Sequence, residues 1–502
     1  MSIEATPEAI EKSDKSDKKP ESTDTKPKMT EETPIVTRHS LQLSEGGTFI
    51  YDVTTGRLPL KNEKGEIEAQ LFFMAYTKVL NEGELSEDRP LMFSFNGGPG
   101  SSSVWLHLGA LGPKRVRLED DGALPAPPYR LVDNPDTWLG NTDLVFIDPV
   151  GTGYSRALNE DLNKKFWNVK GDIEAVGEFI RLYLSRYKRW TSPLYLVGES
   201  YGTTRAAGLA GHLIEKGIAF NGIILVSSVL NFQTLEAAKG NDLPYILYLP
   251  TYAATAHFHN KLGSFLQEDL MRTLEQVQEF ALGDFATALM HGDSLPAEER
   301  KRVATEVAFY TGLSVDYVEK SDLRVEIMRF CKELLREEDR SVGRLDSRFK
   351  GIDALTVSHN FDHDPSMSAI RPPYTACFNH YVRTALGYET DEAYEILGGV
   401  KSWDFNQGED GWVSYTDTSE ALRAAFAKNP HLRVFVASGF YDLATPYFAT
   451  RYTLDHLGLD KSLRNQMTTR DYTAGHMMYI DVKCLKRLAN DVSAWLKGEL
   501  KD

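Results

Sequence analysis

Cysteine is scarce in this chain. The 502 residues include only three cysteines, Cys331, Cys377 and Cys484, and they lie far apart in the sequence. Zinc sites and redox motifs use closely spaced cysteines, so neither kind of site is expected. Three scattered cysteines are also too few for a framework of disulfide bonds.

Long apolar runs and an excess of basic residues are also missing. No stretch approaches the roughly 20 apolar residues that a membrane-spanning helix needs, and the first 28 residues contain no apolar run typical of a signal peptide. We therefore expect a cytoplasmic protein with no membrane partner. The formal net charge of −16 disfavours nucleic acid as a partner, because contacts to phosphates require a basic face.

The composition that remains is that of a globular protein, with 42% hydrophobic and 25% charged residues. Residues 1–34 contain few large apolar side chains and many charged and polar ones, which predicts disorder. From His39 onward, branched and aromatic residues separated by turn residues predict an antiparallel meander. The short apolar runs LMFSF (91–95) and DLVFID (143–148) are typical of parallel strands buried on both faces.

A strand–helix–strand order follows these runs. An amphipathic stretch at 172–188 precedes the strand pattern at 194–197, and a sharp turn then leads into a second helical pattern and another strand. Strand signals stop after Asn231, so residues 231–430 are predicted to form an inserted, mainly helical cap. Strand patterns resume after it, which assigns 35–230 and 431–502 to one α/β core with a mostly parallel sheet flanked by helices.

The turn in this unit, Gly198-Glu199-Ser200-Tyr201-Gly202, fits the pattern G-x-S-x-G. The pattern alone also describes an ordinary tight turn with small residues. Here a strand precedes it and a helix follows, which is the context of the nucleophile turn of the α/β-hydrolase fold. We therefore predict Ser200 as a catalytic nucleophile.

A serine nucleophile needs a base, and the base needs an orienting carboxylate. In the α/β-hydrolase fold the acid follows a later strand and the histidine comes last. Asp442 follows the strand pattern RVFVAS, and His476 lies between the final strand pattern and the last helix. Taken singly, Asp442 is also typical of a turn or helix cap and His476 of a surface histidine. Their joint placement predicts a triad with Ser200.

A glycine-rich loop, Asn96-Gly97-Gly98-Pro99-Gly100-Ser101, follows the strand at 91–95. Acyl transfer requires two N–H donors for the oxyanion, and the expected donors are the amides of Gly98 and Tyr201. A phosphate-binding loop is the competing interpretation. The sequence lacks the Lys-Ser/Thr ending and the glycine spacing that such loops need.

The motifs NGGPGSSS, DPVGTGYS, GESYG and GHMMYID occur in this order and together resemble the serine carboxypeptidase family. The resemblance covers about 90–230 and 430–502, and the cap matches far less well. It implies that Ser200, Asp442 and His476 are the triad and that no cofactor or metal is used. It also implies that Asn96 and Glu199 bind the terminal carboxylate of a peptide, for which Glu199 must be protonated because two ionised carboxylates repel.

The chain departs from the family pattern at three positions. Ser94 and Ala110 stand where the family has a Trp and a second Glu of the carboxylate site, and Ser101 replaces a cysteine. An arginine, Arg205 or Arg115, is a candidate for the lost anion contact, although a salt-bridged or exposed arginine is the ordinary interpretation.

Two groups of histidines are candidate metal ligands, but neither is expected to bind a metal. His359 and His363 lie among aspartates in VSHNFDHDPS, where polar loops often collect such residues, and the AHFHN pair is interpreted as part of a cap helix.

The predicted function is hydrolysis of C-terminal amino acids from peptides through an acyl-enzyme on Ser200. Another serine hydrolase activity (aminopeptidase, esterase or acyltransferase) is the first alternative, because the fold fixes the nucleophile and not the acyl group. A non-catalytic binding protein is the second. The expected partner is a peptide or small acyl substrate, and the sequence is compatible with a homodimer without determining the oligomeric state.

Overall fold

The computed structural model describes residues 29–42, 47–405 and 414–500. Residues 1–28, most of the segment predicted to be disordered, lie outside this range. Residues 29–34 are described and contact the core: Glu31 forms ion pairs with Lys61 and Arg186, and Glu32 with Arg57. The prediction of disorder is therefore wrong for residues 29–34. Their glutamates form ion pairs with basic residues that are distant in the sequence, and composition alone does not reveal such contacts.

The centre of the protein is a ten-stranded sheet with the order β1-β2-β3-β7-β4-β9-β10-β13-β14, to which β8 (Arg156–Ala157) adds beside β3. The N-terminal strands form the expected antiparallel meander: β1 (Ile35–Gln42), β2 (Thr48–Lys61) and β3 (Ile67–Lys78). The other strands run parallel to one another: β4 (Leu91–Phe95), β7 (Asp143–Ile147), β9 (Leu194–Ser200), β10 (Gly222–Ser228), β13 (Arg433–Gly439) and β14 (Met467–Tyr472). This confirms the mostly parallel sheet.

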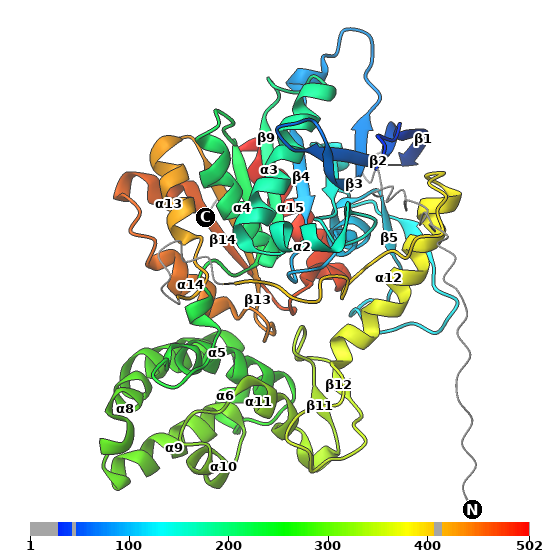
Figure 1. The fold of residues 1–502 in the computed structure, drawn as a ribbon. Coiled ribbons are helices and arrows are strands. Elements are labelled where there is room, and N and C mark those ends of the chain that lie inside the picture. Colours follow the sequence, from blue (N-terminus) through cyan, green and yellow to red (C-terminus); the bar gives the residue numbers. More distant parts are fainter. Residues whose placement is uncertain (1–28, 43–46, 406–413, 501–502) are drawn as a thin grey trace, which may run out of the picture.

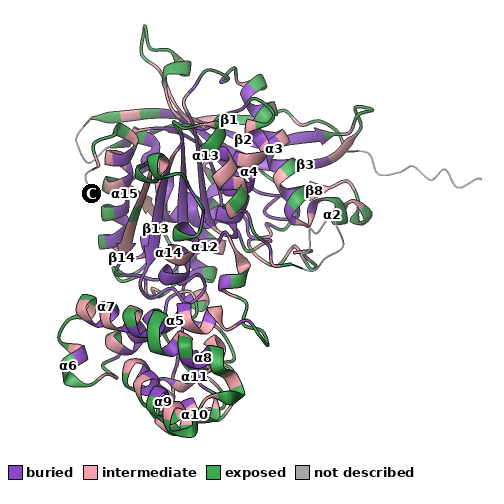
Figure 2. Ribbon diagram, turned by 90° about the vertical axis from the view of Figure 1, so that its left-hand side faces the viewer, coloured by how far each residue is buried: buried purple, intermediate pink, exposed green. Residues whose placement is uncertain are grey.

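Alternate residues of the central strands enter two apolar layers, one on each face of the sheet. In β10, Ile224 and Val226 belong to one layer and Ile223 and Leu225 to the other. Successive side chains of a strand point to opposite faces, so a sheet covered on both sides needs continuous apolar runs. Figure 2 shows the resulting buried centre of the sheet.

Helices cover both faces. One apolar layer includes residues of α12 (Pro365–Thr384) and α15 (Val482–Lys497). The other includes residues of α3 (Val169–Arg186), α4 (Tyr201–Ile214) and α13 (Ser419–Lys428). Helix α14 (Tyr447–Asp455) follows β13 along the chain. This is the α/β-hydrolase arrangement that the sequence predicted.

The segment 231–430 divides into two parts by its packing. Its first helices lie below the sheet in Figure 1 and share a third apolar cluster with residues 440–449, which follow β13. They include α5 (Leu243–Phe258), α7 (Leu270–Phe280), α8 (Ala286–His291), α9 (Ala297–Thr311), α10 (Val315–Lys320) and α11 (Ile327–Glu333). Helices α12 and α13 instead pack on the core, so the predicted single cap contains elements that cover the sheet.

Candidate active site

The turn around Ser200 is strained in a way that small neighbours permit. Strand β9 ends at Ser200 and α4 begins at Tyr201, and Ser200 has φ 59° and ψ −131°, a conformation that L-residues rarely adopt. A side chain at Gly198 would collide with the Gly202 carbonyl, and one at Gly202 would meet the Phe95 carbonyl at 2.8 Å. The two glycines let the turn close, and the Ser200 side chain is presented at the carboxyl end of β9.

Asp442 and His476 are brought together at the same edge of the sheet. His476 Nδ1 lies 2.8 Å from Asp442 Oδ2, and both residues are buried. Asp442 also accepts hydrogen bonds from the amides of Ala444 (2.8 Å) and Thr445 (3.0 Å) and from the Thr445 hydroxyl (2.8 Å). Because a carboxylate only accepts, His476 Nδ1 is the donor, and its Nε2 is left to act as a base.

The environment of His476 sets its basicity. Burial opposes protonation of the imidazole, but the charge of Asp442 and its hydrogen bond outweigh burial, so the pKa of His476 is raised above its usual value. The imidazole therefore accepts a proton more readily than a free histidine would. That is the property a general base requires.

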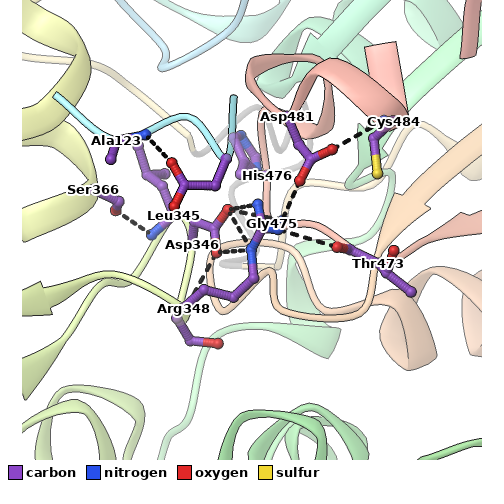
Figure 3. A network of polar contacts seen from close by, with 12 residues as sticks. Ala123, Leu345, Asp346, Arg348, Ser366, Thr473, Gly475, His476, Asp481 and Cys484 are labelled. Carbon is purple, nitrogen blue, oxygen red and sulfur yellow. Dashed lines mark hydrogen bonds and ion pairs between the residues drawn. The ribbon is translucent and has the colours of Figure 1, made fainter. Parts of the chain in front are cut away.

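A second set of contacts fixes the loop that carries His476. Oδ2 of Asp346, a buried residue, accepts a hydrogen bond of 3.1 Å from the Gly475 amide, and Arg348 joins Asp346 (2.8 Å) to Asp481 (3.2 Å) (Figure 3). The His476 amide donates to the Leu345 carbonyl at 2.6 Å. The sequence analysis missed this network, because residues 344–348 lie more than 120 positions from the histidine and belong to no recognisable motif.

Gly98 and Tyr201, the predicted oxyanion donors, line one cavity with Ser200 and His476. The glycine loop packs directly on the start of α4, since a side chain at Gly97 would collide with the Tyr201 and Gly202 amides. Gly98 has φ 103°, which favours glycine. The cavity measures about 260 Å³.

Glu199 and Asn96 also line this cavity and contact each other. Asn96 Nδ2 donates to Glu199 Oε1 at 2.9 Å, and the Tyr479 hydroxyl donates to Oε2 at 2.6 Å. Burial raises the pKa of Glu199 to about 7, against the opposing effects of His476 and the two hydrogen bonds. Glu199 is therefore protonated in mildly acidic solution, the state in which it can donate to a carboxylate. Tyr479 lies in the GHMMYID motif but was given no role from sequence.

Two of the three positions that depart from the family pattern are packed in the interior, whereas the third, Ser101, lines the cavity. Ser94 and Ala110 are fully buried, and Ala110 belongs to an apolar layer of the core. Neither is among the described residues that line the cavity.

Arg205 does not supply an anion contact to this cavity, so that hypothesis is wrong. It is buried, forms an ion pair with Asp172 at 2.7 Å and donates to the Asn96 carbonyl at 2.7 Å. A guanidinium engaged with a buried carboxylate is held there by the high cost of leaving either charge unpaired. Arg115, on β5 (Lys114–Val116), is also absent from the described lining residues. The cavity does contain an arginine that the sequence analysis did not consider, Arg344.

In the described ranges, no group of three or more His, Cys, Asp or Glu side chains is arranged to hold a metal ion. His359 and His363 lie in the loop before α12, where Asp364 caps the helix by accepting from the Ser366 amide at 2.9 Å. His259 contacts the Ser347 carbonyl at 2.7 Å. Asp364 therefore serves as a helix cap, and His259 is held by a backbone carbonyl.

Comparison with known proteins places this site in a family. The sequence model of the serine carboxypeptidase family matches residues 54–486. The chain belongs to the serine carboxypeptidase family. The match includes the serine turn, Asp442 and His476, and it runs through the inserted segment as well as the core.

Similar curated proteins include serine carboxypeptidase-like 5 of Arabidopsis thaliana, 32% identical over 158 residues, which are 31% of this chain and 33% of that protein. The pheromone-processing carboxypeptidase KEX1 of Saccharomyces cerevisiae is 34% identical over 157 residues, 29% of this chain and 20% of that protein. The matched stretches thus span a third or less of these relatives' lengths. The crystal structure of a KEX1 form, a prohormone-processing carboxypeptidase, superposes with a TM-score of 0.55 at 17% identity over 90% of this chain and 92% of that one, which supports the fold.

All three cysteines are buried and unpaired. Within the described residues, none of the helices has the length and apolar character needed to cross a bilayer.

Proposed function

We propose that this chain is a serine-type carboxypeptidase that removes C-terminal amino acids from peptides. The observation that carries the proposal is the pair Asn96 and Glu199 beside Ser200. An amide donor and a carboxyl group with a pKa of about 7 share one cavity with the serine and histidine. Such a pair binds the free carboxylate of a peptide end, and this places the last peptide bond at Ser200.

The first half of the reaction forms the acyl-enzyme. Ser200 Oγ attacks the carbonyl carbon of the last peptide bond while His476 Nε2 takes its proton, and Asp442 stabilises the resulting imidazolium. The oxyanion accepts hydrogen bonds from the Gly98 and Tyr201 amides. The C–N bond then breaks as His476 returns the proton to the leaving nitrogen, and the terminal amino acid departs.

The second half hydrolyses the ester. A water molecule gives a proton to His476 Nε2 and attacks the acyl carbon, and collapse of the second tetrahedral intermediate breaks the bond to Ser200 Oγ. His476 returns the proton to Ser200. The product is a peptide one residue shorter, with a new terminal carboxylate.

The test compares three substrate types at equal concentration: N-blocked dipeptides, aminoacyl amides and simple esters. We expect turnover of the blocked dipeptides in the wild type and none in Ser200→Ala. Turnover confined to aminoacyl amides or to esters would replace the proposal with an aminopeptidase or esterase activity on the same scaffold. Failure of Ser200 to react with a fluorophosphonate probe would favour a non-catalytic binding protein.

A cytoplasmic location is a further part of the proposal. It is supported by the three free thiols, since a reducing compartment keeps cysteines in this state. Fractionation of cells that express the full chain tests it, and recovery of the protein in the medium or in secretory vesicles would contradict it.

A further inference from the structure

Arg344 presents a guanidinium without a partner at the active-site cavity. It is exposed, and it is the only Lys or Arg among the described residues that line this cavity. Within the described part of the chain, its side chain takes part in no hydrogen bond or ion pair. An arginine carries five N–H donors and a permanent charge, so it is available to a ligand in the cavity.

The backbone that carries Arg344 is held in place. The Arg344 amide donates to Asp364 Oδ1 at 3.2 Å, and its carbonyl accepts from the Leu443 amide at 3.0 Å. The next residue, Leu345, accepts from the His476 amide at 2.6 Å and is seen beside His476 in Figure 3. Arg344 therefore extends from a fixed point between the loops that carry Asp442 and His476.

This position lies on the side of the leaving group. During acylation the leaving nitrogen must come within reach of His476, which protonates it. The terminal amino acid consequently lies beside His476 and its neighbour Leu345, while Asn96 and Glu199 hold its main-chain carboxylate. Arg344 is adjacent to Leu345 and both residues line the cavity, which brings the guanidinium within the region available to the terminal side chain.

We infer that Arg344 selects peptides whose terminal residue is Asp or Glu. The inference rests on the proposed function and deepens it. A guanidinium binds a carboxylate through two parallel hydrogen bonds, the strongest polar contact available to this side chain. The chain has a net charge of −16 and repels a peptide end that carries two negative charges. A cation in the cavity offsets that repulsion, and the effect is larger for an end with two carboxylates than for an end with one.

The experiment compares two blocked dipeptides of nearly equal shape, one ending in Phe-Glu and one in Phe-Gln, at about pH 6. The terminal side chain of the first is then ionised, and Glu199 is still largely protonated because its pKa is about 7. We expect kcat/KM to favour the Glu peptide by about fivefold, a modest ratio because water screens an exposed pair. High salt should reduce the ratio.

Three variants test the assignment. Arg344→Gln should bring the Glu to Gln ratio close to one while turnover of the Gln peptide stays near the wild-type level. Arg344→Glu should favour a peptide that ends in Lys. Arg329→Gln is the matched control, because Arg329 is an exposed arginine on α11 that does not line the cavity, and it should leave the ratio unchanged. A full wild-type ratio in Arg344→Gln would overturn the inference.

Failure of the inference can be distinguished from failure of the proposed function. If the wild type cleaves the Gln peptide, the proposed carboxypeptidase activity is supported, whatever the ratio of kcat/KM between the Glu and Gln peptides. If neither peptide is cleaved, calorimetric binding of both peptides to Ser200→Ala decides instead. If Ser200→Ala binds the Glu peptide more tightly than the Gln peptide, and the double variant Ser200→Ala/Arg344→Gln does not, the role of Arg344 is supported. If Ser200→Ala binds the two peptides equally, or binds neither, the inference is overturned.

Discussion

The Tyr479 hydroxyl donates a 2.6 Å hydrogen bond to Oε2 of Glu199, a buried carboxyl group next to the serine. The bond favours the ionised form of Glu199, whereas burial disfavours it more strongly, and the resulting pKa is about 7. Binding of a peptide carboxylate needs the protonated form. The protonation state of this one group therefore links substrate affinity to pH.

We predict that KM for a blocked dipeptide rises about tenfold between pH 6 and pH 8, the change expected for a binding group with a pKa near 7. Glu199→Gln stays neutral and should reduce the rise to less than twofold, while the acidic fall in kcat that reflects His476 persists. Tyr479→Phe removes a contact that lowers the pKa of Glu199, so its KM should rise at higher pH than in the wild type. A pH series of kcat and KM for the three proteins measures this. If KM of Glu199→Gln kept the full pH dependence of the wild type, another group would have to bind the peptide carboxylate.

The Asp346 contact to the Gly475 amide predicts a positioning role. Asp346→Ala should lower kcat by about 10- to 100-fold, because small displacements of a catalytic base have effects of that size, and should leave KM within about twofold. Thermal melting separates a local effect from unfolding. The conservative variant Asp346→Asn keeps an oxygen acceptor for the Gly475 amide and should recover part of kcat. Equal losses of kcat in both variants would contradict a role through this hydrogen bond.

Ala110 stands where the family has a glutamate, yet restoring that residue should not restore a binding site. Ala110 is fully buried in an apolar layer, so Ala110→Glu places a carboxyl group without a partner in the core. We expect a loss of about 2 kcal/mol or more in the free energy of unfolding, with no decrease in KM. Ala126→Glu, at an exposed position, is the control and should change the stability little. Chemical denaturation of the three proteins gives the comparison, and a stable Ala110→Glu protein with lower KM would contradict the packing argument.

Reductant should leave activity and the melting temperature unchanged, because all three cysteines are free. The thiols are also buried, and burial raises the pKa of Cys377 to about 11, so alkylating reagents should react slowly in the folded protein and quickly after denaturation. Thiol counting with and without denaturant measures this. A melting temperature that falls in reductant would reveal a disulfide bond.

The sequence predicted the parts of the fold that depend on local patterns. The run at 91–95 coincides with β4, and the turn at Ser200 lies between a strand and a helix, because continuous apolar runs and small turn residues leave a clear mark in sequence. It did not predict that α12 covers the sheet, since an amphipathic helix shows that one side is buried and not which partner buries it. The Asp346 network and the position of Arg344 depend on contacts between distant segments, which no local pattern specifies. Arg205 was considered because of its charge, and only the structure shows its partner Asp172.

Mass spectrometry of one unblocked peptide, incubated with the wild type and with Ser200→Ala, shows directly whether Ser200 removes residues from the C-terminus. We expect products shortened from the C-terminus by one residue at a time in the wild type, and an unchanged peptide with the variant, whose melting temperature should match that of the wild type. Shortening from the N-terminus, internal cleavage, or an equal rate of C-terminal shortening in Ser200→Ala would contradict the proposed activity.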